Sequence, residues 1–146
     1  MIVTATQTKN MKEQVSLLMN EAIEVIVKDI EQLNSNLNYS FYWCEENQKK
    51  KKLISLLQSK QDHILHFPLV ILCQTRLERL DVQSIFHSSF STISYSLLTV
   101  ETPFQERRTI FTQFQQGQLS VLISTPGIIG RGIELQAANS VRMNTE

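Results

Sequence analysis

The sequence has 146 residues, which suits a single domain that buries its core without metal ions or disulfides. Hydrophobic residues make up 42% and charged residues 19%, as in an ordinary soluble globular domain. Lys+Arg and Asp+Glu are equal at 14 each, so the chain has no overall basic field, and any nucleic-acid surface must be local.

Cysteines, histidines and apolar stretches exclude several further classes. Cys44 and Cys73 lie in apolar runs that read as strands, which favours buried free thiols over a disulfide. No apolar stretch has the length of a membrane span and no signal segment follows Met1, so we expect a cytoplasmic protein without a membrane partner. His63 and His66 have no convincing third ligand, so we expect no metal site.

The first part of the chain predicts short elements. Residues 2–6 are β-branched and read as a strand, and residues 23–27 read as another. Asn10 and Glu13 have the spacing of a helix capping box. The aromatic residues 39–44 predict a further strand, in which we favour core packing over base stacking. The residues expected to face inward are Met11, Val15, Leu18, Met19 and Ala22 on the helix, and Tyr39, Phe41 and Trp43 in the last strand.

Amphipathic stretches alternate with apolar runs from residue 49 onward. Residues 49–60 predict a helix, and residues 68–75 form an apolar run that suits a strand covered on both faces. Thr75 and Glu78 have capping-box spacing and open a second helix. The residues expected to face the core are Leu53, Leu56 and Leu57 on the first helix, and Leu77, Leu80 and Ile85 on the second.

The next predicted strand, residues 93–100, leads into a third helix. Thr102 as N-cap, Pro103 in the first helical position and Gln105 as capping-box partner predict its start, and Gly117 predicts its end. The apolar face of this helix is expected to consist of Phe104, Phe111 and Phe114.

The remaining chain completes an alternation of strand and helix. Residues 119–125 predict a strand, a turn-rich segment follows, and residues 139–144 predict a last strand. This order is typical of an α/β fold with a mainly parallel sheet and helices on both faces. The expected central sheet contains residues 69–73, 93–98 and 121–124.

The most informative pattern lies in the last third of the chain. It consists of Q-x-x-R from Gln105, F-x-x-G from Phe114, a strand, and S-T-P-G-I-I-G-R-G-I-E from Ser124. It resembles the C-terminal half of DEAD-box RNA helicases, in which Q-x-x-R, F-x-x-G and a strand precede T-D-x-x-A/S-R-G-x-D. Residues 68–75 resemble motif IV of that family, and T-A-T from Thr4 resembles motif III.

The resemblance implies a RecA-like three-layer α/β sandwich. Residues 1–38 would be the end of a first RecA-like domain and a linker, and residues 39–146 a second RecA-like domain cut before motif VI. It implies no catalytic residue in this chain. By the same resemblance, the RNA-contacting residues are Thr75, Gln105, Arg108, Thr125, Gly127 and Arg131, the nucleotide-contacting residues are Gly132 and Glu134, and the interdomain residues are Thr4 and Thr6.

Physical reasoning leads to the same RNA-contacting residues. They follow predicted strand ends, where open α/β sheets bind their ligands. Glycines such as Gly127 let a ligand approach the backbone and its N–H groups. Hydroxyls, amides and guanidinium groups are the usual phosphate contacts. We therefore expect a track for the backbone of single-stranded RNA, recognised by shape more than by base sequence.

Structural roles compete with these functional ones. Gln105 fits the partner of a helix cap as well as an RNA contact. The stem of Arg108 could pack on Phe104 and Phe111. The lysines at residues 49–52 are more often a solvated helix face than a nucleic-acid patch.

Several positions depart from the family pattern. Pro126 stands where the family has Asp, and Gly130 where it has Ala or Ser. Glu134 replaces the Asp that holds the nucleotide ribose, and Glu101 ends a Val-Glu pair that replaces His-Gly, which adds an acid near the RNA track. The sequence contains neither a P-loop nor a D-E-A-D motif nor the motif VI arginines, so we expect the isolated chain to have no ATPase activity.

Two functions follow from these observations. The first is the RNA-binding C-terminal domain of an ATP-dependent RNA helicase, with an N-terminal RecA-like domain as partner and with ATP and magnesium bound only by the two-domain protein. The alternative is a catalytically degenerate assembly module of a ribonucleoprotein granule or of the piRNA pathway, as in Tudor-linked Yb-type proteins. An apolar flank near Val141 further predicts self-association.

Overall fold

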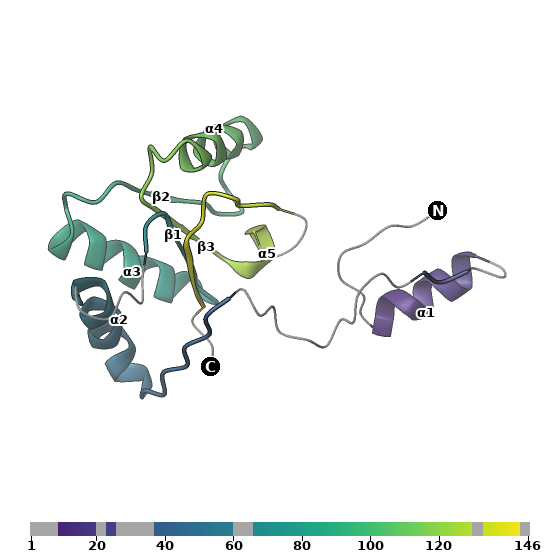
Figure 1. The fold of residues 1–146 in the computed structure, drawn as a ribbon, viewed down its shortest axis with the longest axis horizontal. Coiled ribbons are helices and arrows are strands. Elements are labelled where there is room, and N and C mark those ends of the chain that lie inside the picture. Colours follow the sequence, from purple (N-terminus) through teal and green to yellow (C-terminus); the bar gives the residue numbers. More distant parts are fainter. Residues whose placement is uncertain (1–8, 20–22, 26–36, 60–65, 130–132, 144–146) are drawn as a thin grey trace. The chain divides into compact units, whose positions relative to one another are not determined.

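A computed structural model describes residues 9–19, 23–25, 37–59, 66–129 and 133–143. The chain divides into two compact units, Met1–Tyr42 and Trp43–Glu146 (Figure 1). The second unit holds the sheet and therefore every described candidate for a functional residue.

The first unit contains the helix α1 (Lys9–Leu18), and no residue of this helix is buried. The helix already includes Lys9, so Asn10 lies inside it and the predicted capping box is wrong. Residues 23–25 have no regular secondary structure, so the strand predicted for residues 23–27 is also wrong where it can be compared. The strand predicted for residues 2–6 lies outside the described residues.

The second unit contains an all-parallel sheet of four strands in the order β2-β3-β1-β4. Its strands are β1 (Leu69–Leu72), β2 (Tyr95–Leu97), β3 (Val121–Ser124) and β4 (Ser140–Met143). Every residue of β1 and β3 is buried, as expected of central strands covered on both faces. The predicted α/β fold and the three predicted strands of its parallel sheet are confirmed.

One face of the sheet is covered by α2 (Lys49–Gln58), which follows a 3-10 turn (Glu46–Gln48), and by α3 (Arg76–Ser89). Alternate strand residues face these helices because successive side chains of a strand point to opposite faces. The buried cluster on this side consists of Leu53, Leu69, Ile71, Cys73, Val82, Ile85, Phe86, Val121 and Ile123.

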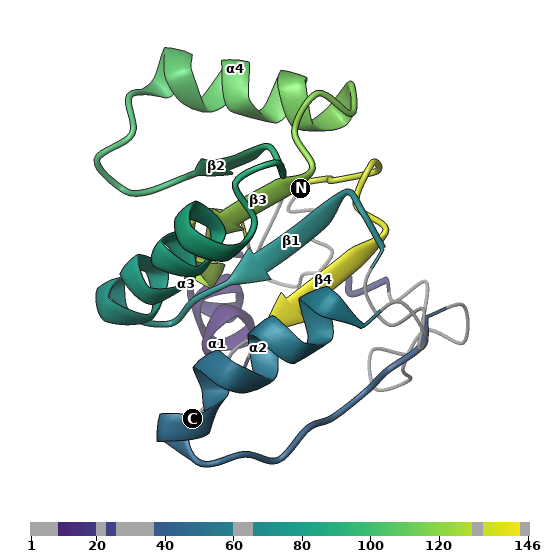
Figure 2. The same cartoon turned by 90° about the vertical axis from the view of Figure 1, so that its left-hand side faces the viewer.

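The other face is covered by α4 (Phe104–Gln115) and the short α5 (Pro126–Ile129). Figure 2 shows α4 and α3 on opposite sides of the strands, which gives the three layers of the predicted sandwich. No helix within the described ranges is long and apolar enough to cross a membrane. The buried cluster here consists of Val70, Leu72, Leu98, Ile110, Phe114, Leu122 and Ile129.

Gly117 ends α4 as predicted, because it has a φ of 72°. Its N–H donates to the carbonyl of Phe114, and the N–H of Gln118 donates to the carbonyl of Gln113. This pair of hydrogen bonds is a Schellman motif, in which glycine adopts the left-handed conformation at little steric cost.

The aromatic segment of residues 39–44 differs from its prediction. It forms no strand, and the side chains of Phe41 and Trp43 are 89% and 100% exposed. An alternating strand needs a neighbour to pair with, and no described strand pairs with this segment. The expected core packing of these aromatic residues is therefore wrong.

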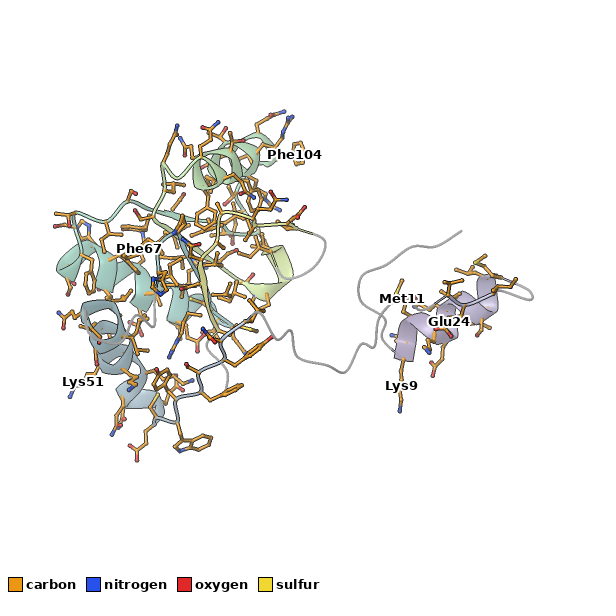
Figure 3. All side chains as sticks on the ribbon, viewed as in Figure 1. Lys9, Met11, Glu24, Lys51, Phe67 and Phe104 are labelled. Atoms are coloured by element: carbon orange, nitrogen blue, oxygen red, sulfur yellow. The ribbon has the colours of Figure 1, made fainter. Side chains whose placement is uncertain are left out.

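The orientation of α3 and α4 differs from its prediction in two places. The buried stripe of α3 is Val82, Ile85 and Phe86, so Leu77 and Leu80 fall on the opposite side and are exposed. In α4, Ile110 and Phe114 face the sheet, and Phe104 is 71% exposed. Figure 3 shows Phe104 at the outer end of the helix, beyond the strands that could cover it.

The two cysteines are free, but only Cys73 is buried. Burial raises the pKa of its thiol to about 11, so the protonated form prevails at neutral pH. We predict that iodoacetamide at pH 8 modifies Cys44 in the folded protein and modifies Cys73 only after unfolding in urea. Mass spectrometry of wild type and Cys44→Ser checks this, since rapid labelling of folded Cys44→Ser would contradict the burial of Cys73.

Candidate nucleic-acid interface

The carboxyl ends of β2, β3 and β1 lie side by side, because all strands of the sheet run in the same direction. Beyond β1 and β3, the N–H of Cys73 donates to the carbonyl of Ser124 at 2.8 Å. Beyond β2, the buried Ser124 Oγ donates to the carbonyl of Leu98 at 2.9 Å. These bonds fix three strand ends, and the segments that follow them, at one edge of the sheet.

Thr75 begins α3 directly beyond β1 in a complete capping box, as predicted. Its Oγ1 accepts from the N–H of Glu78 at 3.1 Å, and Glu78 Oε2 accepts from the N–H of Thr75 at 3.2 Å. A threonine hydroxyl that accepts one bond still has its own proton to donate. Thr75 is exposed, so this proton is available to a phosphate oxygen.

The capping box is connected to α2 through Glu78. Its Oε2 also accepts from the N–H of Gln74 at 2.8 Å, and its Oε1 lies 3.9 Å from Lys49 Nζ. Lys49 in turn pairs with Glu46 at 2.6 Å, and Lys50 pairs with Asp81 at 3.0 Å. Glu78 thus positions Thr75, while Lys49 and Lys50 are engaged in binding α2 to α3.

The segment beyond β2 is held by hydrogen bonds that the sequence did not suggest. Thr102 Oγ1 accepts from the N–H of Thr99 at 2.9 Å, so Thr102 closes a turn and does not cap α4. Arg107 donates from Nε to the carbonyl of Thr102 and from Nη2 to the carbonyl of Val100, both at 2.8 Å. Arg107 is therefore a structural residue.

Gln105 and Arg108 lie on the outward face of α4. Pro103 is at the N-cap and no side chain caps this helix, so the predicted capping role of Gln105 is wrong. Both side chains are exposed, and Arg108 has no hydrogen bond or ion pair with any described residue. The two residues share an open depression whose other lining residues are Thr109, Thr112 and Gln113.

Arg76 and Arg79, in the first turn of α3, are candidates that the sequence reasoning missed. Neither guanidinium forms a hydrogen bond or ion pair with a residue that the structure describes. Positive charge at the N-terminal end of a helix opposes the helix dipole, so the dipole does not account for arginines at these positions. A signal was present in the sequence, since Arg76 directly follows the predicted cap at Thr75 and Arg79 lies four residues after it.

Thr125 and Gly127 follow β3 at the same edge. The carbonyl of Thr125 accepts from the N–H groups of Ile128 and Ile129, and its side chain is half-buried. Open space surrounds the position that a Cβ would take on Gly127. The fold itself does not require glycine at this position, and a ligand has room to approach the backbone there.

Glu134 lies apart from these residues. Its carbonyl accepts from Gln115 Nε2 at 3.0 Å and its carboxylate accepts from Gln136 Nε2 at 2.8 Å. Gln115 ends α4, roughly 15 Å along the helix axis from Gln105. Glu134 is therefore beside the amino-terminal edge of the sheet, and its nucleotide contact stays a prediction.

Four other predicted site residues lie outside the described ranges, namely Thr4, Thr6, Arg131 and Gly132.

The edge as a whole offers hydrogen-bond donors and positive charge. Thr75, Gln105 and Thr125 supply polar groups, and Arg76, Arg79 and Arg108 supply guanidinium groups that no described residue neutralises by an ion pair. Such a set is suited to phosphate oxygens and carries no group arranged to read a base. Within the described ranges, no His, Cys, Asp and Glu side chains gather into a group that could hold a metal ion.

Comparison with known proteins gives consistent matches. The model of the helicase conserved C-terminal domain matches residues 48–144. The chain is 27% identical over 143 residues to DEAD-box ATP-dependent RNA helicase 41 of Arabidopsis thaliana, which covers 97% of the chain and 27% of that protein. It is 26% identical over 147 residues to the protein of the same name from Oryza sativa subsp. japonica (97% and 26%).

A fungal protein matches in the same way. The chain is 29% identical over 140 residues to ATP-dependent RNA helicase DBP3 of Debaryomyces hansenii, which covers 90% of the chain and 25% of the relative. The chain thus spans about a quarter of the length of these relatives.

Proposed function

The chain belongs to the family of helicase conserved C-terminal domains, in its DEAD-box RNA helicase branch, and from this membership we propose that its carboxyl sheet edge binds the backbone of single-stranded RNA. The observation that carries the proposal is that Arg76, Arg79 and Arg108 lie on the helices that follow β1 and β2 and have no ion-pair partner among the described residues. Thr75 and Thr125 follow β1 and β3 at the same edge of the sheet.

The chemistry of this edge determines what kind of RNA binding is expected. Guanidinium groups and hydroxyls contact phosphates and sugars, which are the same for every base. The net charge of the chain is zero, so attraction is limited to this edge. Binding should therefore be weak, indifferent to base sequence and steeply dependent on salt.

Two adjacent arginines of α4 provide a matched test. Arg107 holds the turn before the helix through two hydrogen bonds, while Arg108 is exposed and has no described partner. We predict that Arg108→Gln lowers the affinity for every RNA sequence alike and makes the log–log salt slope shallower by about 0.7, without changing thermal stability. We predict that Arg107→Gln instead lowers the free energy of unfolding by about 1 kcal/mol or more, and with it the melting temperature.

Fluorescence anisotropy with labelled oligouridylate and oligoadenylate, combined with thermal melting, measures both effects. A folded Arg108→Gln protein with wild-type affinity and salt slope would remove Arg108 from the site. RNA binding would then depend on Arg76 and Arg79. If Arg76→Gln and Arg79→Gln also keep wild-type affinity and salt slope, the proposal is wrong.

The proposal extends to the whole protein from which such a domain comes. There the domain would complete a nucleotide site formed with an N-terminal RecA-like domain, and ATP and magnesium would bind between the two. This is supported by the ATP-dependent helicase names of the relatives. RNA-stimulated release of phosphate by the full-length protein tests it, and full-length protein that binds RNA without releasing phosphate favours the degenerate assembly module.

The alternative function and the exposed strand β4 each lead to one further proposal. A degenerate module would act in a cytoplasmic ribonucleoprotein granule, for example in the piRNA pathway. β4 is an edge strand of the described sheet, and its residues Val141 and Met143 are 58% and 55% exposed, which supports self-association. Light scattering at increasing protein concentration tests self-association directly.

A further inference from the structure

Glu101 occupies the tip of a tight turn beyond β2. The N–H of Thr102 donates to the carbonyl of Thr99 at 3.2 Å, which makes residues 99–102 a β-turn with Glu101 in its third position. Arg107 holds the carbonyl groups of Val100 and Thr102 on either side. The backbone of the turn is therefore fixed, and the exposed side chain of Glu101 projects from it at the carboxyl edge of the sheet.

The turn also stabilises the charged form of the Glu101 carboxylate. Thr99 Oγ1 and Thr102 Oγ1 lie 3.2 Å apart, and Thr102 Oγ1 already accepts from the N–H of Thr99. The Thr102 hydroxyl can thus donate to Thr99, which leaves the Thr99 proton for Glu101. This hydrogen bond, followed by the backbone N–H of Glu101 and by Arg79 and Arg76, holds the pKa of the Glu101 carboxyl below its usual range.

The positive groups that act on this carboxylate belong to a different element. Arg76 and Arg79 lie in the first turn of α3, beyond β1, and Glu101 lies beyond β2. Because β1 and β2 flank β3, the three residues follow the ends of the strands on either side of the central strand, at the same edge of the sheet. The exposed Glu101 therefore offers a negative charge at the place where the two arginines would meet a phosphate.

We propose that the Glu101 carboxylate competes with an RNA phosphate for Arg76 and Arg79, so that the chain carries a built-in competitor of its own RNA binding. The turn presents an anion with the charge and the hydrogen-bond acceptors of a phosphate oxygen pair. A phosphate bound by the two arginines would lie in the electrostatic field of this anion. This inference rests on the proposed RNA-binding function of the same edge.

Removing the charge of Glu101 tests the competition. Glu101→Gln keeps the size of the side chain and deletes its charge. The affinity for oligouridylate at 50 mM salt should rise by about threefold to fivefold, as expected when one like charge is removed a few ångströms from a phosphate in water. The salt slope should become steeper by about 0.7, because the arginines gain one phosphate contact.

Two further variants separate local competition from a change in net charge. Glu45→Gln removes one exposed acid before α2, outside the proposed RNA edge, and should leave the affinity unchanged. Arg76→Gln/Arg79→Gln combined with Glu101→Gln should show no gain over Arg76→Gln/Arg79→Gln alone. Thermal melting of each variant confirms that the fold is retained.

The outcomes are distinguishable. If wild type binds RNA with a salt-dependent affinity and Glu101→Gln binds equally, the competition is refuted and the proposed function stands. A gain that persists without the two arginines, or that Glu45→Gln reproduces, also refutes it. If neither wild type nor Glu101→Gln binds RNA, both the competition and the proposed function are wrong.

Discussion

Replacing Phe114 with alanine is expected to lower the free energy of unfolding by about 3–5 kcal/mol. Phe114 is completely buried in the cluster that joins α4 to the sheet, with Ile110 and Leu122 as members of the same cluster. The substitution removes a large apolar side chain and leaves a cavity that the parallel strands can close only in part. Urea denaturation should show a lower midpoint with an unchanged slope.

Phe104 provides the matched control, since it is the same residue type on the same helix. It is 71% exposed at the start of α4, so Phe104→Ala should change stability by no more than about 0.5 kcal/mol. A loss of equal size for both variants would contradict the orientation of α4.

The second large effect is expected for RNA binding when Arg76, Arg79 and Arg108 are all changed to glutamine. Each lost phosphate contact weakens single-strand binding by about eightfold at 50 mM salt, from a slope of about 0.7 per contact relative to 1 M salt. Three lost contacts correspond to a decrease of several hundredfold, roughly, in affinity. Anisotropy titrations with oligouridylate at several salt concentrations measure this loss.

A variant with the same net charge identifies which basic residues matter. Lys50, Lys51 and Lys52 lie on α2, where Lys50 pairs with Asp81, and Figure 3 shows Lys51 on the outer side of the helix. Changing these three lysines to glutamine should leave RNA affinity within about twofold of wild type, because they lie outside the proposed contacts. Equal losses in the two triple variants would mean that net charge, and not the carboxyl edge, determines binding.

Much of the fold could be predicted from the sequence because its signals were local. The runs that became β1 and β3 are continuous and apolar, as central parallel strands require. Thr75 and Gly117 act through contacts within a few residues, and both marked the helix ends where they were expected.

The incorrect predictions of secondary structure arose where the spacing of residues was compatible with more than one hydrogen-bond partner. Thr102 had the spacing of an N-cap, but its hydroxyl closes the turn with Thr99, so Gln105 is free for another role. The aromatic pattern at residues 39–44 required a neighbouring strand, which local sequence cannot reveal.

The sequence predicted where four candidate residues lie in the fold, but it did not draw attention to Arg76 and Arg79. Thr75, Gln105, Arg108 and Thr125 lie at the carboxyl edge because parallel strands bring their ends together. Arg107 and Arg108 look equivalent in the sequence, and only the hydrogen bonds of the folded chain distinguish the structural role of Arg107 from the exposed position of Arg108.

The location of the RNA is the central claim, and backbone amide NMR of the chain titrated with oligouridylate tests it most directly. Binding at the carboxyl edge should shift the amide resonances of the non-proline residues in the ranges 74–79, 99–108 and 125–128, and these shifts should disappear at high salt. Shifts confined to α2 or to the opposite edge at residues 117–120, or no shifts at low salt, would contradict the claim.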